Sequence, residues 1–207
     1  MTATSGAVWR VTPRVWPSPP GRLHDPGADV HVFRADLDDP RRNVDLYRLM
    51  LADAELRRVD DVGHAHTRRR LSIAFGLARI TRAAHVLAPG KTPLDVVSAR
   101  LGSVAVFAAS RGPRVGMALV PAAAGTRGVA HAALEAIGHA KGRATDPDAV
   151  DTAGVGQTLA RGRAALLRVD AGGSAWNVQV LGLAPDVCLV IAGAGPLRTL
   201  RCWALGA

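Results

Sequence analysis

The chain has 207 residues, of which 48% are hydrophobic and 4% aromatic, so we expect one compact domain or two small lobes with a core of Ala, Val and Leu. Its 26 Lys and Arg outnumber its 17 Asp and Glu, which gives a net charge of +9. This charge favours binding of phosphates, nucleic acid or an acidic protein, and it does not discriminate among these partners. No apolar run reaches the roughly 20 residues of a membrane span, and no apolar signal segment opens the chain, so a cytoplasmic protein is expected.

An irregular arm is predicted for residues 1–28, because its many prolines exclude a regular helix. Two tryptophans of this arm, Trp9 and Trp16, are suited to anchoring it on the body of the protein. Residues 30–37 then partly alternate apolar with polar side chains, and this period of two predicts a strand.

Helices are predicted next. Residues 44–58 and 65–87 carry apolar side chains three or four positions apart, which is the spacing of one helix face. Two apolar runs, 104–109 and 115–120, then predict strands. The Ser-Arg-Gly-Pro segment at 110–113 lies between these runs, so we expect it to form a hairpin turn.

The second half of the chain starts again with a predicted helix near residues 129–140. Leucines and arginines within 155–169 predict a basic amphipathic helix. Three strands are predicted to close the chain, at about 175–183, 186–192 and 199–205. The order strand, helices, strands thus occurs twice, which favours an α+β fold of two related lobes, each a small antiparallel sheet with packed helices.

The predicted organisation follows from these elements. The irregular arm covers 1–28, an N-terminal lobe covers 29–112 and a C-terminal lobe covers 113–207.

Several phrases of the sequence occur in the order of one known family. Residues 31–37 resemble the opening strand of this family, and segments between 55 and 79 resemble its arginine-rich helix. Residues 115–121 (Val-Gly-Met-Ala-Leu-Val-Pro) resemble its metal-binding strand. Residues 163–168 (Arg-Ala-Ala-Leu-Leu-Arg) resemble its Lys-Glu-Ala-x-x-Lys helix. From about residue 30 onward, the chain therefore resembles the phosphopantetheinyl transferase superfamily in its two-lobed monomeric form, which implies that fold.

In that family, a helical glutamate and strand carboxylates hold magnesium on the pyrophosphate of coenzyme A, and a carrier-protein serine attacks the phosphate. Ala118 and Val120 stand at the two strand positions, and Ala164 stands at the helical one. None of these side chains has an oxygen to offer magnesium. The resemblance therefore implies a kept scaffold without magnesium-dependent transfer, and no metal ion is expected.

The function expected from this resemblance is a repurposed tailoring enzyme, such as a cyclase, for a carrier-bound or free polyketide or another natural-product intermediate. Shape, proximity and one acid or base can carry such a reaction. Two alternatives stay open: a non-catalytic partner that binds an acyl carrier protein or coenzyme A, and residual holo-acyl-carrier-protein synthase activity. Whether the chain is an enzyme at all thus stays open, and nucleic acid is the weakest partner because no recognised module accompanies the charge.

Candidate catalytic residues are few. His64 and His66 lie close to Asp61, and this grouping suits proton transfer near neutral pH or a transition metal. The alternative is a polar loop between two helices. Asp95 is a further candidate acid, and the sequence identifies no partner for it.

The cofactor-binding candidates are basic. Arg68 and Arg70 belong to a run of three arginines that suits coenzyme A phosphates or an acidic carrier protein, with a solvated helix face as the alternative. Successive helical residues point about 100° apart, so at most one or two of the run can serve one ligand. Lys91 and Ser98 are assigned through the resemblance to the family's phosphate loop and serine phrase, although another alignment deletes this region.

Overall fold

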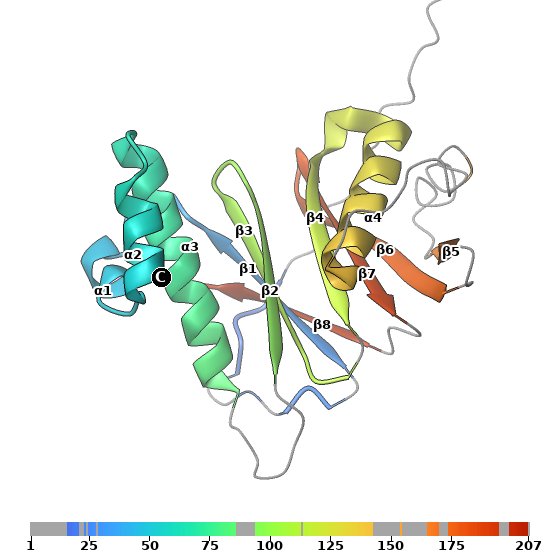
Figure 1. Ribbon diagram of the computed structural model, residues 1–207, viewed down its shortest axis with the longest axis horizontal. Coiled ribbons are helices and arrows are strands. Elements are labelled where there is room, and N and C mark those ends of the chain that lie inside the picture. The colour runs from blue at the N-terminus through green and yellow to red at the C-terminus, as the bar shows by residue number, and fades with distance from the viewer. Residues whose placement is uncertain are drawn as a thin grey trace, which may run out of the picture. The chain divides into compact units, whose positions relative to one another are not determined.

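The computed structural model describes residues 16–20, 23, 25–27, 29–85, 94–112, 114–142, 154, 165–169, 174–194 and 199–206. The chain divides into two compact units (Figure 1). The first unit comprises Trp16–Gly112 with Thr199–Ala207, and the second unit is built on Pro113–Arg198. Among the described residues, no helix has both the length and the apolar character that crossing a membrane requires.

The first unit contains a four-stranded sheet. Its strands are β1 (Val30–Asp36), β2 (Asp95–Leu101), β3 (Val104–Ser110) and β8 (Leu200–Leu205), and they lie in the order β2-β3-β1-β8. Strand β3 runs antiparallel to both β1 and β2, whereas β8 runs parallel to β1. The sheet is therefore mixed, and its last strand comes from the far end of the chain.

Three helices follow β1: α1 (Val44–Arg48), α2 (Asp53–Asp60) and α3 (Ala65–Ala84). Helix α3 packs on the sheet face that carries Phe33, and Ile73 of the helix is fully buried in the same apolar core. Burying large apolar side chains on one helix face is the main term that holds such a helix on its sheet.

Arg42 ties the helices to the sheet. Its Nε donates to the carbonyl of Asp36 at 2.7 Å, one terminal amino group donates to the carbonyl of Leu205 at 2.7 Å, and the other donates to Tyr47 Oη at 3.0 Å. The side chain is buried, and these bonds give each of its three nitrogens a partner, each from a different element. Arg42 therefore joins the end of β1, helix α1 and the end of β8.

The second unit contains the strands β4 (Val115–Pro121), β5 (Ala165–Val169), β6 (Ser174–Ala184) and β7 (Val187–Ala194). They form an antiparallel sheet in the order β4-β7-β6-β5. A short helix, η1 (Ala122–Ala124), and the long α4 (Gly125–Lys141) follow β4. In Figure 1, α4 lies along β4, and their side chains share one apolar core.

Small residues set the distance between α4 and β4. A Cβ atom at Gly116 of β4 would lie 1.9 Å from the carbonyl oxygen of Ala136 and 2.7 Å from the amide nitrogen of Ala140. No side chain fits there without moving the helix backbone. Alanines such as Ala132, Ala133 and Ala136 line the helix face, which explains how a core with few aromatic residues becomes dense.

The α+β class predicted from the sequence is confirmed, but the antiparallel sheet predicted for the N-terminal lobe is wrong, because β8 runs parallel to β1. The predicted helix over 44–58 is divided into α1 and α2, and the helix over 65–87 is described as α3. Trp16 is buried, whereas Trp9 lies outside the described residues.

The hairpin predicted at 110–113 is wrong. Strand β3 pairs with β1 and β2, while β4 pairs with β7 in the other sheet, so the two strands are not partners. The hairpin in this region joins β2 to β3, where Gly102 has a φ of 58°. A glycine adopts this left-handed conformation without steric cost, and it sets the tight turn.

The helix predicted over 155–169 is also wrong where it is described, because residues 165–169 form β5 and pair with β6. Residues 155–164, which include Ala164, lie outside the described residues. The closing strand predicted at 199–205 is present as β8, but it pairs with β1 in the first unit. The lobe expected over 113–207 thus gives its last strand to the other unit.

Candidate functional site

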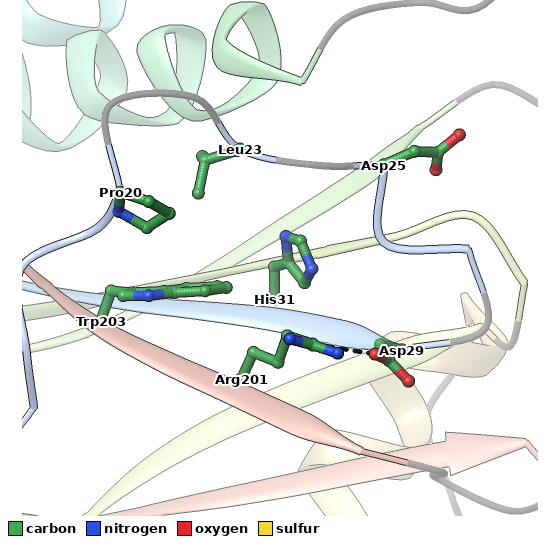
Figure 2. A pocket seen from close by; sticks show the side chains of 7 residues that line it. All are labelled: Pro20, Leu23, Asp25, Asp29, His31, Arg201 and Trp203. Atoms are coloured by element: carbon green, nitrogen blue, oxygen red, sulfur yellow. Dashed lines mark hydrogen bonds and ion pairs between the residues drawn. The ribbon is translucent and has the colours of Figure 1, made fainter.

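A pocket of about 330 Å³ lies on the first unit (Figure 2). The described residues that line it come from the arm (Pro20, Leu23 and Asp25), from the start of β1 (Asp29 and His31) and from β8 (Arg201 and Trp203). Apolar side chains form one part of its wall, and charged or polar side chains form the other. The pocket therefore suits a small organic molecule with a few polar groups.

The pairing of β1 with β8 explains how these residues meet. In the parallel register, His31 lies opposite Arg201, and Phe33 lies opposite Trp203. Since alternate residues of a strand share a face, all four side chains stand on the same side of the sheet. The rings of His31 and Trp203 are 4.9 Å apart in an edge-to-face arrangement, and Trp203 stacks on Phe33 at 5.2 Å.

His31 is 3% exposed, and its position is fixed by a second histidine. Its Nδ1 lies 3.0 Å from Nε2 of His85, the residue that ends α3. The Nδ1 of His85 lies 2.7 Å from the carbonyl oxygen of Thr81. A chain of two hydrogen bonds thus runs from the helix backbone through His85 to His31.

This chain determines which ring nitrogens carry hydrogen. A carbonyl oxygen only accepts, so Nδ1 of His85 must be the donor toward Thr81. In a neutral His85, Nε2 then has no hydrogen and accepts, which makes Nδ1 of His31 the donor. A neutral His31 therefore carries its lone pair on Nε2, which forms no hydrogen bond with the described residues.

Both histidines are held in the neutral form. Burial lowers the pKa of His31 to about 4, and the positive charges of His85, when protonated, and of Arg201 act in the same direction. Asp29 and Asp25 oppose this effect. Burial also lowers the pKa of His85, although its bond to Thr81 opposes the shift. At neutral pH, His31 is therefore an uncharged hydrogen-bond acceptor at the pocket.

Arg201 is the cationic group of the pocket. Its Nε donates to Oδ2 of Asp29 at 2.9 Å, while its two terminal amino groups form no hydrogen bond with the described residues. Asp25 is held separately, because it accepts a hydrogen bond of 2.8 Å from Nε of Arg111. Figure 2 shows His31 between Trp203 and the Arg201–Asp29 pair, with Pro20 and Leu23 across from it.

The catalytic candidates of the sequence lie elsewhere on the first unit. Asp61 is the C-cap of α2 and His64 is the N-cap of α3, and both are exposed. His66 is also exposed, with Nε2 3.5 Å from Oδ1 of Asp38. These residues occupy the polar junction between two helices, and none of them lines the pocket. Their catalytic role stays a prediction.

The arginine run is largely engaged within the protein. Arg70 forms a two-pronged ion pair with Asp38, and its hydrogen bond lowers the pKa of that carboxyl. Arg69 donates to the carbonyls of Asp39 and Arg42 at 3.2 and 3.1 Å. The side chain of Arg68 forms no hydrogen bond or ion pair with the described residues. A phosphate at this site would compete with Asp38 for Arg70, whereas Arg68 has no such competitor among the described residues.

The remaining candidates lie on or near β2. Asp95 opens this strand opposite Ser110, Ser98 lies three residues further on, and both side chains are exposed. Lys91 lies outside the described residues. The structure thus brings neither Asp95 nor Ser98 to the pocket, and the roles assigned to them stay predictions.

The positions expected to hold metal-binding carboxylates in the transferase family are buried and apolar. Ala118 and Val120 belong to the core between β4 and α4. Neither side chain has an oxygen atom that could bind magnesium. Within the described residues, no group of three or more His, Cys, Asp or Glu could hold a metal ion. The residues present therefore do not fit a magnesium site here.

The sequence analysis did not identify His31, His85 and Arg201 as site residues. One local signal existed: His31 is a titratable side chain in the apolar run Val-His-Val-Phe. Its partners could not be inferred, because His85 is 54 positions away and Arg201 belongs to a strand that was placed in the other lobe. Parallel pairing of β1 with β8 is the missing information.

Comparison with known proteins gives no family for this chain: no protein-family model matches it, and no curated protein sequence matches it.

Proposed function

We propose that the chain is an acid–base enzyme that acts on a small organic molecule in the His31 pocket. The observation that carries this proposal is the arrangement of His31: a buried, neutral imidazole with Nδ1 bound to His85 and its Nε2 lone pair left at a pocket. Buried titratable groups in a pocket with a strongly shifted pKa are frequent in active sites. The sequence resembles a transferase family but lacks the carboxylates of that family. This combination supports a tailoring reaction, such as cyclisation of a natural-product intermediate.

The chemistry follows from the hydrogen-bond chain. Nε2 of His31 accepts a proton from the substrate, while Nδ1 keeps its hydrogen bond to His85. The imidazolium that forms is stabilised by Asp29 and Asp25, whose charges favour protonation of His31. The proton then returns to a different atom of the same molecule. Ring closure and isomerisation both fit this scheme, because neither needs an oxidant, a reductant or a second substrate.

The weak basicity of His31 restricts the substrate. A base whose pKa is about 4 removes protons efficiently only from acidic groups. Enols, phenols and carbon acids activated by neighbouring carbonyls are more acidic than ordinary alcohols and unactivated C–H groups, so they are the better substrates for such a weak base. Such groups are frequent in polyketide intermediates, which connects the proposed chemistry with the expected substrate class.

The proposal can be tested with nitrobenzisoxazole as a probe of proton abstraction. A base removes the carbon-bound hydrogen, the N–O bond breaks and a coloured nitrophenolate forms, so the rate is read by absorbance. We expect the protein to exceed the buffer rate and the rate to fall as the pH decreases through about 4, where His31 becomes protonated. His31→Asn should abolish the excess rate, because an amide is not a base.

His131→Asn is the matched control, since it makes the same change at an exposed histidine of α4. Circular dichroism of both variants checks that they fold alike. An excess rate that survives in His31→Asn, or a wild-type rate equal to that of buffer, contradicts the proposal.

A further inference from the structure

The pocket also indicates the class of substrate, an inference that rests on the proposed function. We infer that it takes a planar hydroxy acid, meaning a hydroxyaryl carboxylate or an enol of similar shape. The ligand hydroxyl donates to Nε2 of His31, and the anionic oxygens accept from the terminal amino groups of Arg201. The aromatic or enolic body lies against Trp203.

The hydroxyl requirement follows from the fixed tautomer. His31 faces the pocket as an acceptor, because its only N–H is committed to His85. A carbonyl or carboxylate oxygen against Nε2 would place two lone pairs together. Leaving a buried acceptor without a donor also costs free energy, so a ligand with an O–H or N–H at this position binds better than one without it.

The anion requirement follows from Arg201. The Nε bond to Asp29 fixes the guanidinium plane and leaves both terminal amino groups for a ligand. A planar fork of donors matches a carboxylate better than it matches a neutral carbonyl. Asp25 does not compete for Arg201, because its carboxylate is held by Arg111.

The two requirements are coupled through charge. Arg201 is one of the groups that lower the pKa of His31. An anion bound to Arg201 offsets this positive charge and so raises the proton affinity of Nε2. The substrate would thereby strengthen the base that acts on it, because the pKa of His31 is higher with an anion on Arg201 than in the empty pocket.

The planar shape follows from the aromatic wall. Trp203 stacks on Phe33 with an interplanar angle of 21°, and its ring is nearly perpendicular to that of His31, at 75°. Pro20 and Leu23 supply apolar surface across the pocket (Figure 2). A volume of about 330 Å³ is at the small end for ligand sites and suits one ring system better than an extended chain.

Calorimetric titration of the full chain at neutral pH tests this inference. The probes are the ortho, meta and para isomers of hydroxybenzoate, with benzoate as the probe without the hydroxyl and phenol as the probe without the carboxylate. We expect at least one isomer to bind about tenfold more tightly than both benzoate and phenol. Arg201→Gln should remove the advantage over phenol, and His31→Asn should remove the advantage over benzoate.

Arg41→Gln is the matched control, because Arg41 is an exposed arginine that pairs with Asp39 outside the pocket. Equal affinity for hydroxybenzoates and benzoate, or an unchanged preference in Arg201→Gln, overturns the inference. Arg201 is exposed, so its replacement should fold even if His31→Asn does not. If hydroxybenzoates bind selectively but the protein shows no proton abstraction that depends on His31, the proposed function is wrong and the substrate class stands. If proton abstraction depends on His31 but hydroxybenzoates do not bind selectively, the substrate class is wrong and the proposed function stands.

Discussion

His31 and Arg42 are both polar and both 3% exposed, yet their burial has different consequences. Arg42 donates to the carbonyls of Asp36 and Leu205 and to Tyr47 Oη, so each of its three nitrogens has a partner in the framework. Among the described residues, the ring of His31 forms one hydrogen bond, to His85, and His31 lines a pocket. A buried polar group without a partner calls for an explanation, and a ligand bound in the pocket would supply one for His31.

His31 should make the first unit sensitive to acid. The pKa of a histidine is ordinarily 6.5 and that of His31 in the fold is about 4, so between these values the unfolded chain binds a proton that the folded chain does not. Stability is therefore full above pH 6.5 and falls as the pH decreases toward 4, by on the order of 3 kcal/mol. The lowered pKa of His85 acts in the same direction. Urea midpoints at several pH values measure the effect.

In His31→Asn, the dependence of the urea midpoint on pH should become shallower over this range. His131→Asn provides the comparison, because that side chain is exposed. If the two variants show the same dependence on pH as the wild type, His31 is not the source of the acid sensitivity.

The sequence predicted the charge of individual side chains, but it did not predict their interaction partners. The basic character of the arginine run was evident, but the engagement of Arg70 with Asp38 and of Arg69 with backbone carbonyls depends on the packing of α3 against the end of β1. The pocket depends on two pairings that are distant in the chain, His31 with His85 and β1 with β8. No local pattern encodes either of them.

At the scale of elements, apolar patterns located most strands and helices but did not determine their partners. The runs that form β3 and β4 were predicted as strands, and the short segment between them favoured a hairpin, yet each strand belongs to a different sheet. Residues 165–169 have a helical composition, and pairing with β6 overrides it. Strand β2 was not predicted, because its segment was interpreted through the transferase resemblance.

The contact of α4 with β4 should be the least tolerant of added volume. In Gly116→Ala, the new methyl group would meet the backbone of Ala136 at 1.9 Å, so the helix must move away from the sheet. We expect the second unit to lose about 3 kcal/mol of unfolding free energy or more, as overpacked cores do. Denaturant unfolding followed by circular dichroism measures this loss.

Gly63→Ala is the control for that experiment. A Cβ atom at Gly63 would have nothing within 4 Å, and this glycine lies in the loop before α3. Its replacement should change the unfolding free energy by about 0.5 kcal/mol at most. Comparable losses in the two variants would show that the close approach at Gly116 does not determine the stability of this contact.

At the scale of the whole molecule, β8 is the element that makes the first unit discontinuous in sequence. It follows all of the second unit along the chain, yet it supplies Arg201 and Trp203 to the pocket and the Leu205 carbonyl to Arg42. On its other side, the amide of Ala204 donates to the carbonyl of Pro17 at 2.8 Å, so the arm covers β8 in turn.

Truncation after Thr199 should therefore weaken the first unit and leave the second intact. Without β8, strand β1 loses its parallel partner and Arg42 loses one acceptor. We expect faster amide hydrogen exchange in β1 and in the arm, with protection in β4 and β7 unchanged, as read by mass spectrometry. Truncation after Leu205 keeps β8 and should preserve the wild-type pattern. Equal protection of β1 in both truncated chains would contradict this role of β8.

The discontinuity of the first unit also imposes an order on biosynthesis. A ribosome releases the residues of β8 only after it has translated the whole of Pro113–Arg198, so the sheet of the second unit can assemble while β1 still has an open hydrogen-bonding edge. Val30 and Val32 on that nascent edge are apolar and become fully buried only in the finished fold. Strand β1 is thus translated early but paired on this side last, and until then its open edge can pair with other chains.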